Sequence, residues 1–304
     1  MSSIGASVVE RALRLADEGG DDLLAIVGPT ASGKTALAVE LAERLGGEVV
    51  SADSVQIYRG FDVGSGKPSA VDLSRARHHL IGTVDPLAPL DAASWARRAS
   101  QAVADVRARG RVPILCGGSF LWVKAFLFGL AEAPPASALV RGRHRETADR
   151  EGRAALHAHL REVDAESARR LHENDFVRVS RALEVYELTG KPLSAWQREH
   201  GFAHARHSAR LLGIACEPSI LTQRIQARTA AWLDAGWVDE VEGLIESGYG
   251  DTRAMGSVGY AEIRAMIGGA IARAELEGAI VRKTRVFARR QRTWLKHVDV
   301  QWLC

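Results

Sequence analysis

Short apolar runs separated by longer amphipathic segments are the main pattern along this chain. Buried parallel strands have continuous apolar sequences of this kind, because helices cover both faces of their sheet. In the first part of the chain the runs alternate with helical patterns, which predicts βαβ units with right-handed crossovers. We therefore expect an α/β fold, a parallel sheet flanked by helices. The predicted strands lie at 23–27, 48–52, 78–84, 112–116 and 210–216.

A proline pair, Pro134-Pro135, marks a change of pattern. From 139 to 205 the chain has a helical period and is rich in Arg, His and Glu, with no strand pattern until 210–216. The simplest organisation is a sheet domain interrupted by a helical insertion of about 70 residues. We predict a first core part at 1–135, an all-helical insertion at 136–206 and a second core part at 207–304.

The last predicted helix has an unusual charge pattern. Between 282 and 296 there are seven basic residues and no acidic one. Because a solvated helix face normally carries acids as well, this pattern indicates contact with nucleic-acid phosphates. Five cations recur every three or four positions and form one stripe: Arg282, Arg285, Arg289, Arg292 and Lys296. The residues expected to pack on the core are Ile280, Val281, Phe287, Ala288, Trp294 and Leu295.

A phosphate-binding pattern follows the first predicted strand and precedes a helical segment. The residues are Gly28-Pro29-Thr30-Ala31-Ser32-Gly33-Lys34-Thr35, which match G-x-x-x-x-G-K-[ST] at every fixed position. A strand, loop and helix in this order direct backbone N–H groups toward one point beside the positive end of the helix dipole. Lys34 adds a positive charge, and a hydroxyl at the position of Thr35 holds Mg²⁺ in such loops. The sheet is therefore predicted to be of the P-loop type.

Two further polar residues are candidates for the same site. Asp53 ends the second predicted strand, and ligands of open α/β sheets gather at the carboxyl ends of strands, so its carboxylate should face the P-loop. The alternative for Asp53 is a helix N-cap. Lys67, in the glycine-containing segment 64–68, is either a second phosphate contact or a solvated surface lysine.

Composition narrows the class of protein. A hydrophobic fraction of 46% and a charged fraction of 25% are typical of soluble globular proteins, and a formal net charge of +3 means that any nucleic-acid surface is local. The three cysteines have no zinc spacing, and no apolar run approaches the ~20 residues that span a bilayer, so we expect a cytoplasmic protein. His200, His204 and His207 share a helical face, but Gly201 interrupts that helix and no acid or Cys completes a metal site.

From the residues alone, two other activities stay open. P-loops usually serve nucleotide hydrolysis or phosphoryl transfer, but the strand at 112–116 runs into Gly117-Gly118 without the acid that holds magnesium in such enzymes. A small-molecule kinase with Asp53 as base leaves the basic C-terminal helix unexplained. An RNA-binding protein with a non-catalytic P-loop is the remaining alternative.

Taken in order, the motifs resemble the tRNA dimethylallyltransferase (tRNA isopentenyltransferase) family, of the bacterial type, over nearly the full length of the chain. The motifs are those at 28–35, 53–58 with Gly60, 64–68, 78–81, 117–119, 174–185, 189–192, 258–260 and 284–294. The chain departs from the family pattern with Ser65 and Ser119 where Thr is usual, Trp122 where Tyr is usual, Arg289 where Lys is common, and Gly256-Ser257.

The resemblance implies transfer of a dimethylallyl group from dimethylallyl diphosphate to the N6 amine of the adenosine 3′-adjacent to the anticodon, in tRNAs reading codons that start with U. It implies Mg²⁺ as cofactor, the tRNA anticodon arm as partner, no membrane and a monomer. Asp53, Lys34 and Ser119 are then catalytic, and Thr35 is the metal ligand.

The resemblance also assigns binding residues. Diphosphate contacts are expected from Gly28, Pro29, Thr30, Ala31, Ser32, Gly33, Lys34, Thr35 and Arg224. Contacts to tRNA are expected from Asp53, Ser54, Val55, Gln56, Ser119, Arg141, Val177, Arg178, Val179, Ser180, Arg181, Thr284, Arg285, Val286, Phe287, Ala288, Arg289, Arg290 and Gln291.

Overall fold

The computed structural model describes residues 5–18, 20, 22–88, 90–202, 205–296 and 298–304. The chain forms two compact units, one of Met1–Leu127 with Arg206–Cys304 and one of Phe128–Ala205. The second unit therefore includes the proline pair, whereas the sequence pattern placed the boundary after it. A hydrogen bond holds the proline pair to this unit: Arg181 donates to the carbonyl oxygen of Pro134 at 2.6 Å.

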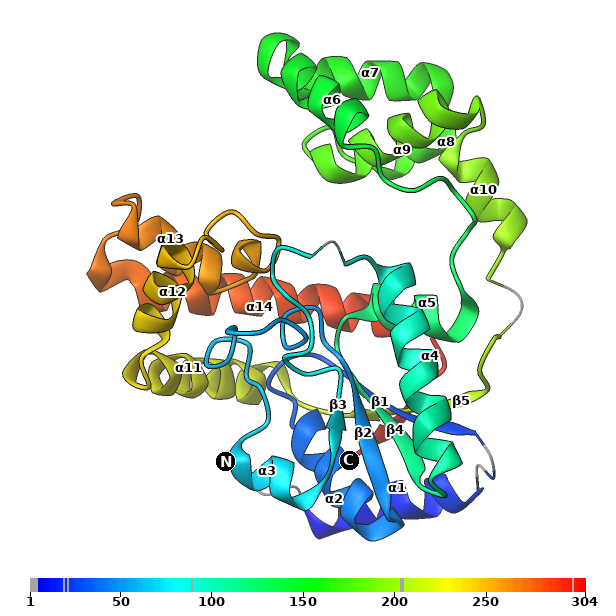
Figure 1. Cartoon of the computed structure of the whole chain (residues 1–304), viewed down its shortest axis with the longest axis vertical. Coiled ribbons are helices and arrows are strands. Elements are labelled where there is room, and N and C mark those ends of the chain that lie inside the picture. Colours follow the sequence, from blue (N-terminus) through cyan, green and yellow to red (C-terminus); the bar gives the residue numbers. More distant parts are fainter. Residues whose placement is uncertain (1–4, 19, 21, 89, 203–204, 297) are drawn as a thin grey trace. The chain divides into compact units, whose positions relative to one another are not determined.

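The first unit is built on a parallel sheet of six strands in the order β3-β2-β4-β1-β5-β6 (Figure 1). This confirms the predicted parallel α/β fold. The central strand β1 is buried at every position, as expected for a strand covered on both faces. The strands are β1 (Leu23–Val27), β2 (Gly47–Ala52), β3 (His78–His79), β4 (Val112–Gly117), β5 (Ala209–Ile214) and β6 (Gln301–Leu303).

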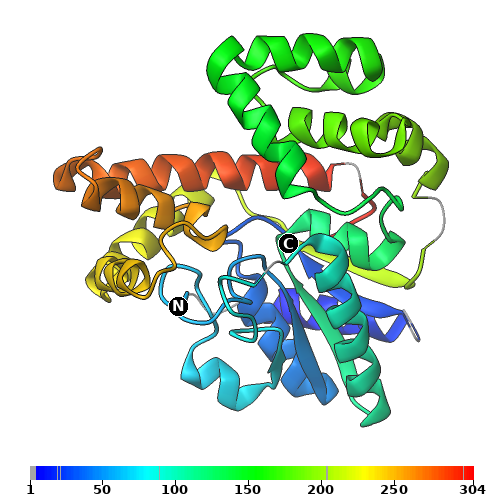
Figure 2. The ribbon, with the colours of Figure 1, turned by 45° about the horizontal axis from the view of Figure 1, so that its top comes forward.

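Helices cover this sheet on both faces. Leu24 and Ile26 of β1 belong to a core cluster that includes residues of α1 (Ala6–Glu18) and α2 (Lys34–Leu45). Figure 2 shows α4 (Ala92–Ala108) running alongside the strands, and its Trp95 stacks on Trp122 of α5 (Phe120–Phe128). The remaining elements before the insertion include the short helix α3 (Ala70–Arg75).

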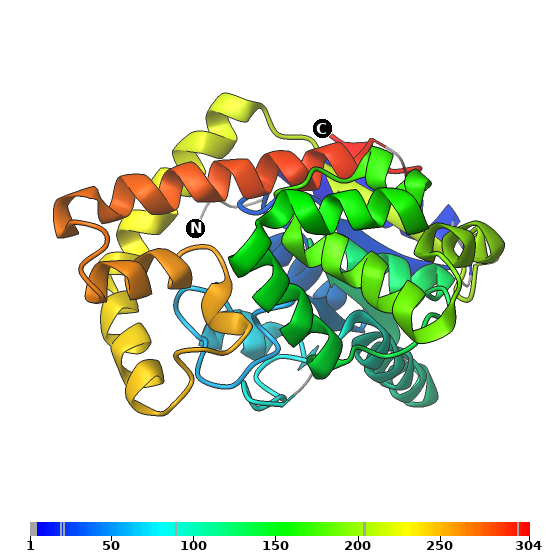
Figure 3. The same ribbon diagram turned by 90° about the horizontal axis from the view of Figure 1, so that it is seen from above.

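After β5 the first unit is mainly helical, as the sequence pattern predicts. Helices α11 and α14 cross and pack through Leu221, Ile225, Val281 and Ala288 (Figure 3). The elements are α11 (Pro218–Asp234), α12 (Trp237–Glu246), η1 (Ala254–Gly256), α13 (Tyr260–Ile267), η2 (Arg273–Glu275) and α14 (Leu276–Leu295). None of the helices in the described ranges is both long and apolar enough to cross a membrane.

Every regular element in the described part of the second unit is a helix. Its core includes Leu156, Leu160, Val179 and Leu183. The helices are α6 (Ala138–Glu151), α7 (Arg153–Val163), α8 (Ala165–Arg170), α9 (Phe176–Thr189) and α10 (Leu193–His200).

One strand prediction was wrong, and one strand was not predicted. Instead of the run 78–84, only His78–His79 pair with β2, because Leu80 and Gly82 have positive φ angles of 62° and 59° that a strand cannot contain. The strand that was not predicted is β6, an edge strand of three residues that pairs with β5 and is too short to show a periodic pattern. Of the histidine group, His204 lies outside the described residues, and His207 stacks on Phe126.

Candidate active site

The P-loop connects β1 to α2 and closes around the side chain of Lys34. Lys34 is the first residue of α2, and its Nζ donates a 2.7 Å hydrogen bond to the carbonyl oxygen of Pro29. Gly33 precedes the helix with φ 101°, a conformation in which a side chain would be strained. A Cβ on Gly28 would lie 3.1 Å from Oγ of Ser32, so the loop also needs glycine for close packing.

Two hydroxyl groups of this loop have no partner among the residues that the structure describes. Oγ of Ser32 is buried without a hydrogen bond, and the Thr35 hydroxyl makes none within the described residues. Burial lowers the pKa of Lys34 to about 8, although the negative charge of Asp53 opposes this shift. Lys34 is therefore still mostly protonated at neutral pH. Free donors, a cation and a helix N-terminus together form a site for a compact anion with several oxygens.

Asp53 lies at the same edge of the sheet. It follows Ala52, the last residue of β2, which is in register with Gly117 of β4, and Gly117 is also in register with Val27 of β1. Oδ1 of Asp53 accepts hydrogen bonds from the N–H groups of Val55 (2.9 Å) and Gln56 (3.2 Å). These bonds stabilise a turn and not a helix, so the N-cap alternative does not hold. Oδ2 receives no hydrogen bond in the described part of the chain and is available to accept a proton.

Ser119 follows β4 and reaches the residue after Asp53. Its Oγ accepts a 2.9 Å hydrogen bond from the N–H of Ser54 and lies 3.1 Å from Oγ of Ser54. A Cβ on Gly117 would approach the carbonyl oxygen of Ala52 to 2.1 Å, so only glycine permits this closeness of β2 and β4. Ser119 therefore positions the turn that contains Asp53.

Helix α11 places two arginines against the P-loop. Nη1 of Arg224, a predicted diphosphate ligand, donates to the carbonyl oxygen of Ser32 at 3.3 Å. Nη2 of Arg228 donates to Oγ1 of Thr30 at 2.8 Å, and its guanidinium stacks on the ring of Trp232, 4.4 Å from the centroid. Arg228 was not among the residues predicted for the site. The sequence feature that could have identified it is its spacing of four residues from Arg224, which places both arginines on one face of the helix.

Gln291 of α14 also contacts the P-loop, although it was predicted to contact tRNA. Its Oε1 accepts a 2.7 Å hydrogen bond from the N–H of Thr30, and its Nε2 donates at 2.9 Å to the carbonyl oxygen of Gly118. Thr284 and Ala288 are buried on the same face of α14. These three side chains therefore anchor the helix and do not belong to its exposed surface.

The exposed face of α14 carries all the basic residues of its sequence. Not one of them forms an ion pair within the described ranges. Val286 and Phe287 are exposed between them, so the expectation that Phe287 packs on the core was wrong. We call this surface the basic face of α14: Arg282, Lys283, Arg285, Arg289, Arg290, Arg292 and Lys296.

In the helical unit most of the predicted tRNA contacts have intramolecular partners. Arg141 and Arg181 both pair with the buried carboxylate of Glu184, at 3.0 Å and 2.6 Å. Arg178 pairs with Asp175. The side chains of two further predicted contacts, Val179 and Ser180, are buried, whereas Val177 is exposed.

Two candidate site residues near Asp53, Gln56 and Lys67, form hydrogen bonds within the protein. The Gln56 amide donates to the carbonyl oxygens of Ser65 and Gly66, at 3.3 Å and 2.9 Å, so it positions that loop. Nζ of Lys67 donates to the carbonyl oxygen of Tyr58 and to Oδ1 of Asp62, at 2.7 Å and 2.6 Å. Lys67 therefore has a structural role and is not a solvated surface lysine. Ser54 and Val55 are partly exposed next to Asp53.

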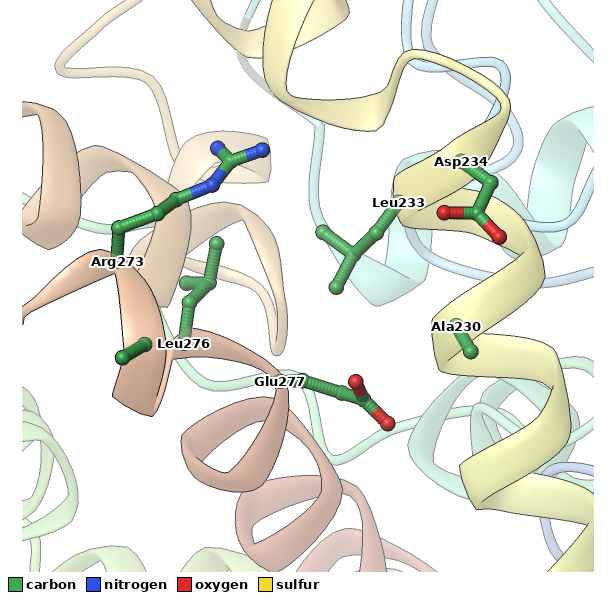
Figure 4. Close-up of a pocket in the computed structure, with 7 residues that line it drawn as sticks. Ala230, Leu233, Asp234, Arg273, Leu276 and Glu277 are labelled. Carbon is green, nitrogen blue, oxygen red and sulfur yellow. The ribbon is translucent and has the colours of Figure 1, made fainter.

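A cavity of about 260 Å³ lies elsewhere in the first unit, between the end of α11 and the start of α14 (Figure 4). Leu233 and Asp234 line it from α11, and Arg273 and Glu277 line it from the opposite side. It contains no P-loop residue. The chemistry of the site therefore rests on the sheet edge and not on this cavity.

Comparison with known proteins identifies the family of this chain. The model of the IPP transferase family matches residues 56–298. The tRNA dimethylallyltransferase of Sorangium cellulosum is 60% identical over 282 residues, which cover 93% of this chain and 90% of that protein. This chain belongs to the IPP transferase family. The tRNA dimethylallyltransferase of Geobacter sulfurreducens is another relative, 45% identical over 92% of this chain and 91% of its own length.

Solved structures of tRNA-modifying transferases have the same fold as this chain. The tRNA isopentenylpyrophosphate transferase of Bacillus halodurans superposes with a TM-score of 0.68 at 33% identity, covering 93% of this chain and 89% of that one. A eukaryotic dimethylallyltransferase acting on tRNA superposes with a TM-score of 0.71 at 23% identity, covering 93% and 74%, which shows a common fold. The chain is thus an enzyme of the IPP transferase family.

Proposed function

We propose that this enzyme transfers the dimethylallyl group of dimethylallyl diphosphate to the N6 amine of the adenosine 3′-adjacent to the anticodon, in tRNAs that read codons starting with U. The products are N6-isopentenyladenosine and diphosphate. The observation that carries the proposal is the pairing of a cationic P-loop with the free carboxylate oxygen of Asp53 at one sheet edge, in a member of this family. The names of the relatives support the transferred group and tRNA as acceptor.

The reaction requires a base and an anion site close together. The adenine amine is a poor nucleophile, because its lone pair is delocalised into the ring. Oδ2 of Asp53 accepts the amine proton as the C–N bond forms. The C–O bond to the diphosphate breaks, and its electron pair leaves with the diphosphate. Lys34, Arg224 and the donors of the loop stabilise this developing charge more strongly in the transition state than in the ground state.

Mg²⁺ fits the donors of this loop. The Thr35 hydroxyl is a hard oxygen ligand at the start of α2, and proteins usually hold Mg²⁺ through one or two groups together with substrate phosphates and water. Among the residues described, no three His, Cys, Asp or Glu side chains are arranged to hold a metal by themselves, which is consistent with this mode. When bound, the ion would supply positive charge next to the diphosphate oxygens.

The tRNA contacts that the side chains support best come from the basic face of α14. Arg285, Arg289 and Arg290 are exposed and free of carboxylates within the described residues, so they are available to phosphates, and Phe287 offers an exposed ring for stacking. In the helical unit Arg178 is exposed, and because surface ion pairs are weak it can exchange Asp175 for a phosphate. Ser54 and Val55 would border the adenine beside Asp53.

The test is to incubate the purified enzyme with dimethylallyl diphosphate and an unmodified tRNA that reads a codon starting with U. Mass spectrometry of the nucleosides should detect N6-isopentenyladenosine, and a tRNA reading codons with another first base should stay unmodified. The variant Asp53→Asn should lose transfer and keep its tRNA affinity. Release of ADP from ATP in the presence of small alcohols, without the modified nucleoside, would instead establish the kinase alternative.

A further inference from the structure

Glu240 of α12 accepts hydrogen bonds both from the loop that precedes α3 and from the neighbouring helix α13 (Figure 1). Its Oε2 accepts from the N–H groups of Asp62 and Val63, at 2.9 Å and 2.6 Å, and its Oε1 accepts from the N–H of Gly64 at 3.4 Å. Oε1 also accepts a 2.5 Å hydrogen bond from the hydroxyl of Tyr260, the first residue of α13. Hydrogen bonds to a charged acceptor are stronger than those between neutral groups, so Glu240 fixes the backbone of this loop.

Two tryptophans pack on the same loop, which we call the 62–66 loop. A Cβ on Gly64 would lie 1.8 Å from Nε1 of Trp237, and a Cβ on Gly66 would lie 2.7 Å from Cζ2 of Trp232. A side chain at either glycine would therefore displace the loop or the ring. Close packing from α11 and α12 thus adds to the hydrogen bonds of the carboxylate and gives the loop one defined position.

The 62–66 loop in turn holds the side chain of Gln56, a residue of the turn that contains Asp53. Nε2 of Gln56 donates to the carbonyl oxygens of Ser65 and Gly66, at 3.3 Å and 2.9 Å. The backbone N–H of Gln56 donates to Oδ1 of Asp53 at 3.2 Å. Hydrogen bonds and one short stretch of backbone therefore connect α12 with the carboxylate at the edge of the sheet.

We propose that Glu240, supported by Tyr260, is a positioning residue of the transfer reaction, which acts through the 62–66 loop and Gln56 to orient Asp53 toward the adenine amine. This inference rests on the proposed function, because it takes Asp53 as the base. A base accepts a proton efficiently only within hydrogen-bond reach, and a displacement of about 1 Å can cost about 100-fold in rate. Loosening the loop should therefore lower the maximal rate more than the affinity for either substrate.

The test compares Glu240→Leu, Glu240→Gln and the control Glu242→Leu, an exposed position on the same helix. Single-turnover transfer is measured at saturating tRNA over a range of dimethylallyl diphosphate concentrations, which separates the maximal rate from the half-saturating concentration. Glu240→Leu should lower the maximal rate about 10- to 100-fold and change the half-saturating concentration less than threefold. Glu240→Gln keeps an acceptor oxygen for the loop, so its rate should recover to within about fivefold of the wild type. The control should match the wild type.

A double variant separates positioning from a general loss of folded protein. Gln56→Met removes the link between the loop and the turn of Asp53, so it should lower the maximal rate by a factor similar to that of Glu240→Leu. Because residues that act in one series are not additive, the double variant should be no slower than Gln56→Met alone. Tyr260→Phe removes one hydroxyl and keeps the buried ring, so it should fold and lose about two- to fivefold in rate. This loss should also disappear in the Gln56→Met background.

Two results would overturn the inference. One is a wild-type maximal rate in Glu240→Leu or, where that variant does not fold, in Tyr260→Phe. The other is multiplication of the single losses in the double variant, which would assign Glu240 to the stability of the fold. Failure of the proposed function is a separate outcome, because the wild-type enzyme itself would then form no N6-isopentenyladenosine.

Discussion

The P-loop and the basic face of α14 are both cationic, but their charges lie in opposite environments. Lys34 and Arg228 at the P-loop are desolvated, and burial lowers their pKa values to about 8 and about 10. The seven cations of α14 are exposed and have no carboxylate partner among the described residues. One residue of α14 joins the two regions, since buried Gln291 contacts the P-loop from the opposite side of that helix.

The difference teaches how one chain can recognise two kinds of phosphate. Buried cations in fixed positions suit a small, dense anion, and their interactions are weakly screened by salt. Exposed cations suit a polyanion, whose binding is governed by counterion release and falls steeply with salt. The helical unit shows a third case, because Arg141 and Arg181 share the buried carboxylate of Glu184, which offsets one of their two positive charges. The number of basic residues alone therefore does not identify a phosphate-binding surface.

The largest expected effect is on the rate of transfer, after substitution of a residue of the P-loop. Lys34→Met should lower the single-turnover rate of transfer about 100- to 1,000-fold, because it removes a charge aimed at the leaving group. Its tRNA affinity, measured by filter binding, should stay within twofold of the wild type. A parallel loss of tRNA affinity would mean that the P-loop and the RNA surface are not independent.

The next effect concerns the basic face of α14. Arg285→Ala combined with Arg289→Ala should weaken tRNA binding about 10- to 30-fold and reduce the salt dependence by about one phosphate contact per arginine. Arg11→Ala with Arg14→Ala on α1 is the matched control, since it removes the same charge from exposed positions. If both pairs weaken binding equally, net charge and not the α14 surface determines the affinity.

The pH dependence should also differ between the two regions. The charge of Lys34 is present below its pKa of about 8 and is lost as the pH rises through that value. Equilibrium binding of dimethylallyl diphosphate without tRNA should therefore weaken about tenfold from pH 7 to pH 9. The tRNA affinity, which depends on the basic face of α14, should change little over this range. Lys34→Arg should flatten the diphosphate profile, and an unchanged profile in that variant would assign the dependence to another group.

The smallest effect uses the two faces of α14 directly. Gln291→Leu should weaken diphosphate binding about fivefold, or about 1 kcal/mol, because the loss of its hydrogen bonds to Thr30 and Gly118 leaves the P-loop less well positioned. Its tRNA affinity should not change. Arg292→Leu, the neighbouring exposed position, should have the reverse profile in the same two titrations. Equal effects of the two variants on both ligands would show that the helix acts as one surface.

Local sequence determined much of this protein. The alternation of apolar runs and helical periods predicts β1, β2, β4 and β5, because buried parallel strands need continuous apolar residues. The positions of the phosphate loop and of Asp53 could also be predicted from local sequence, since the loop directly follows β1 and Asp53 directly follows β2. The exposure of the basic face of α14 follows from its charge pattern alone.

Only the tertiary structure decided which polar side chains serve the site and which serve the fold. Gln56 and Gln291 are polar in sequence, yet both hold loops from the inside. Gln56 donates to the carbonyl oxygen of Gly66 in the following loop, and Gln291 donates to that of Gly118, 173 residues earlier in the chain. Arg228 and Arg181 are both arginines on helices, but Glu184 is one turn away from Arg181, whereas Arg228 meets the P-loop, nearly 200 residues earlier in the chain. A charge next to its partner in sequence can be predicted from spacing. The contact of Arg228 with the P-loop cannot be predicted in this way, because it forms only when α11 packs on that loop, and the local sequence pattern contains no sign of this packing.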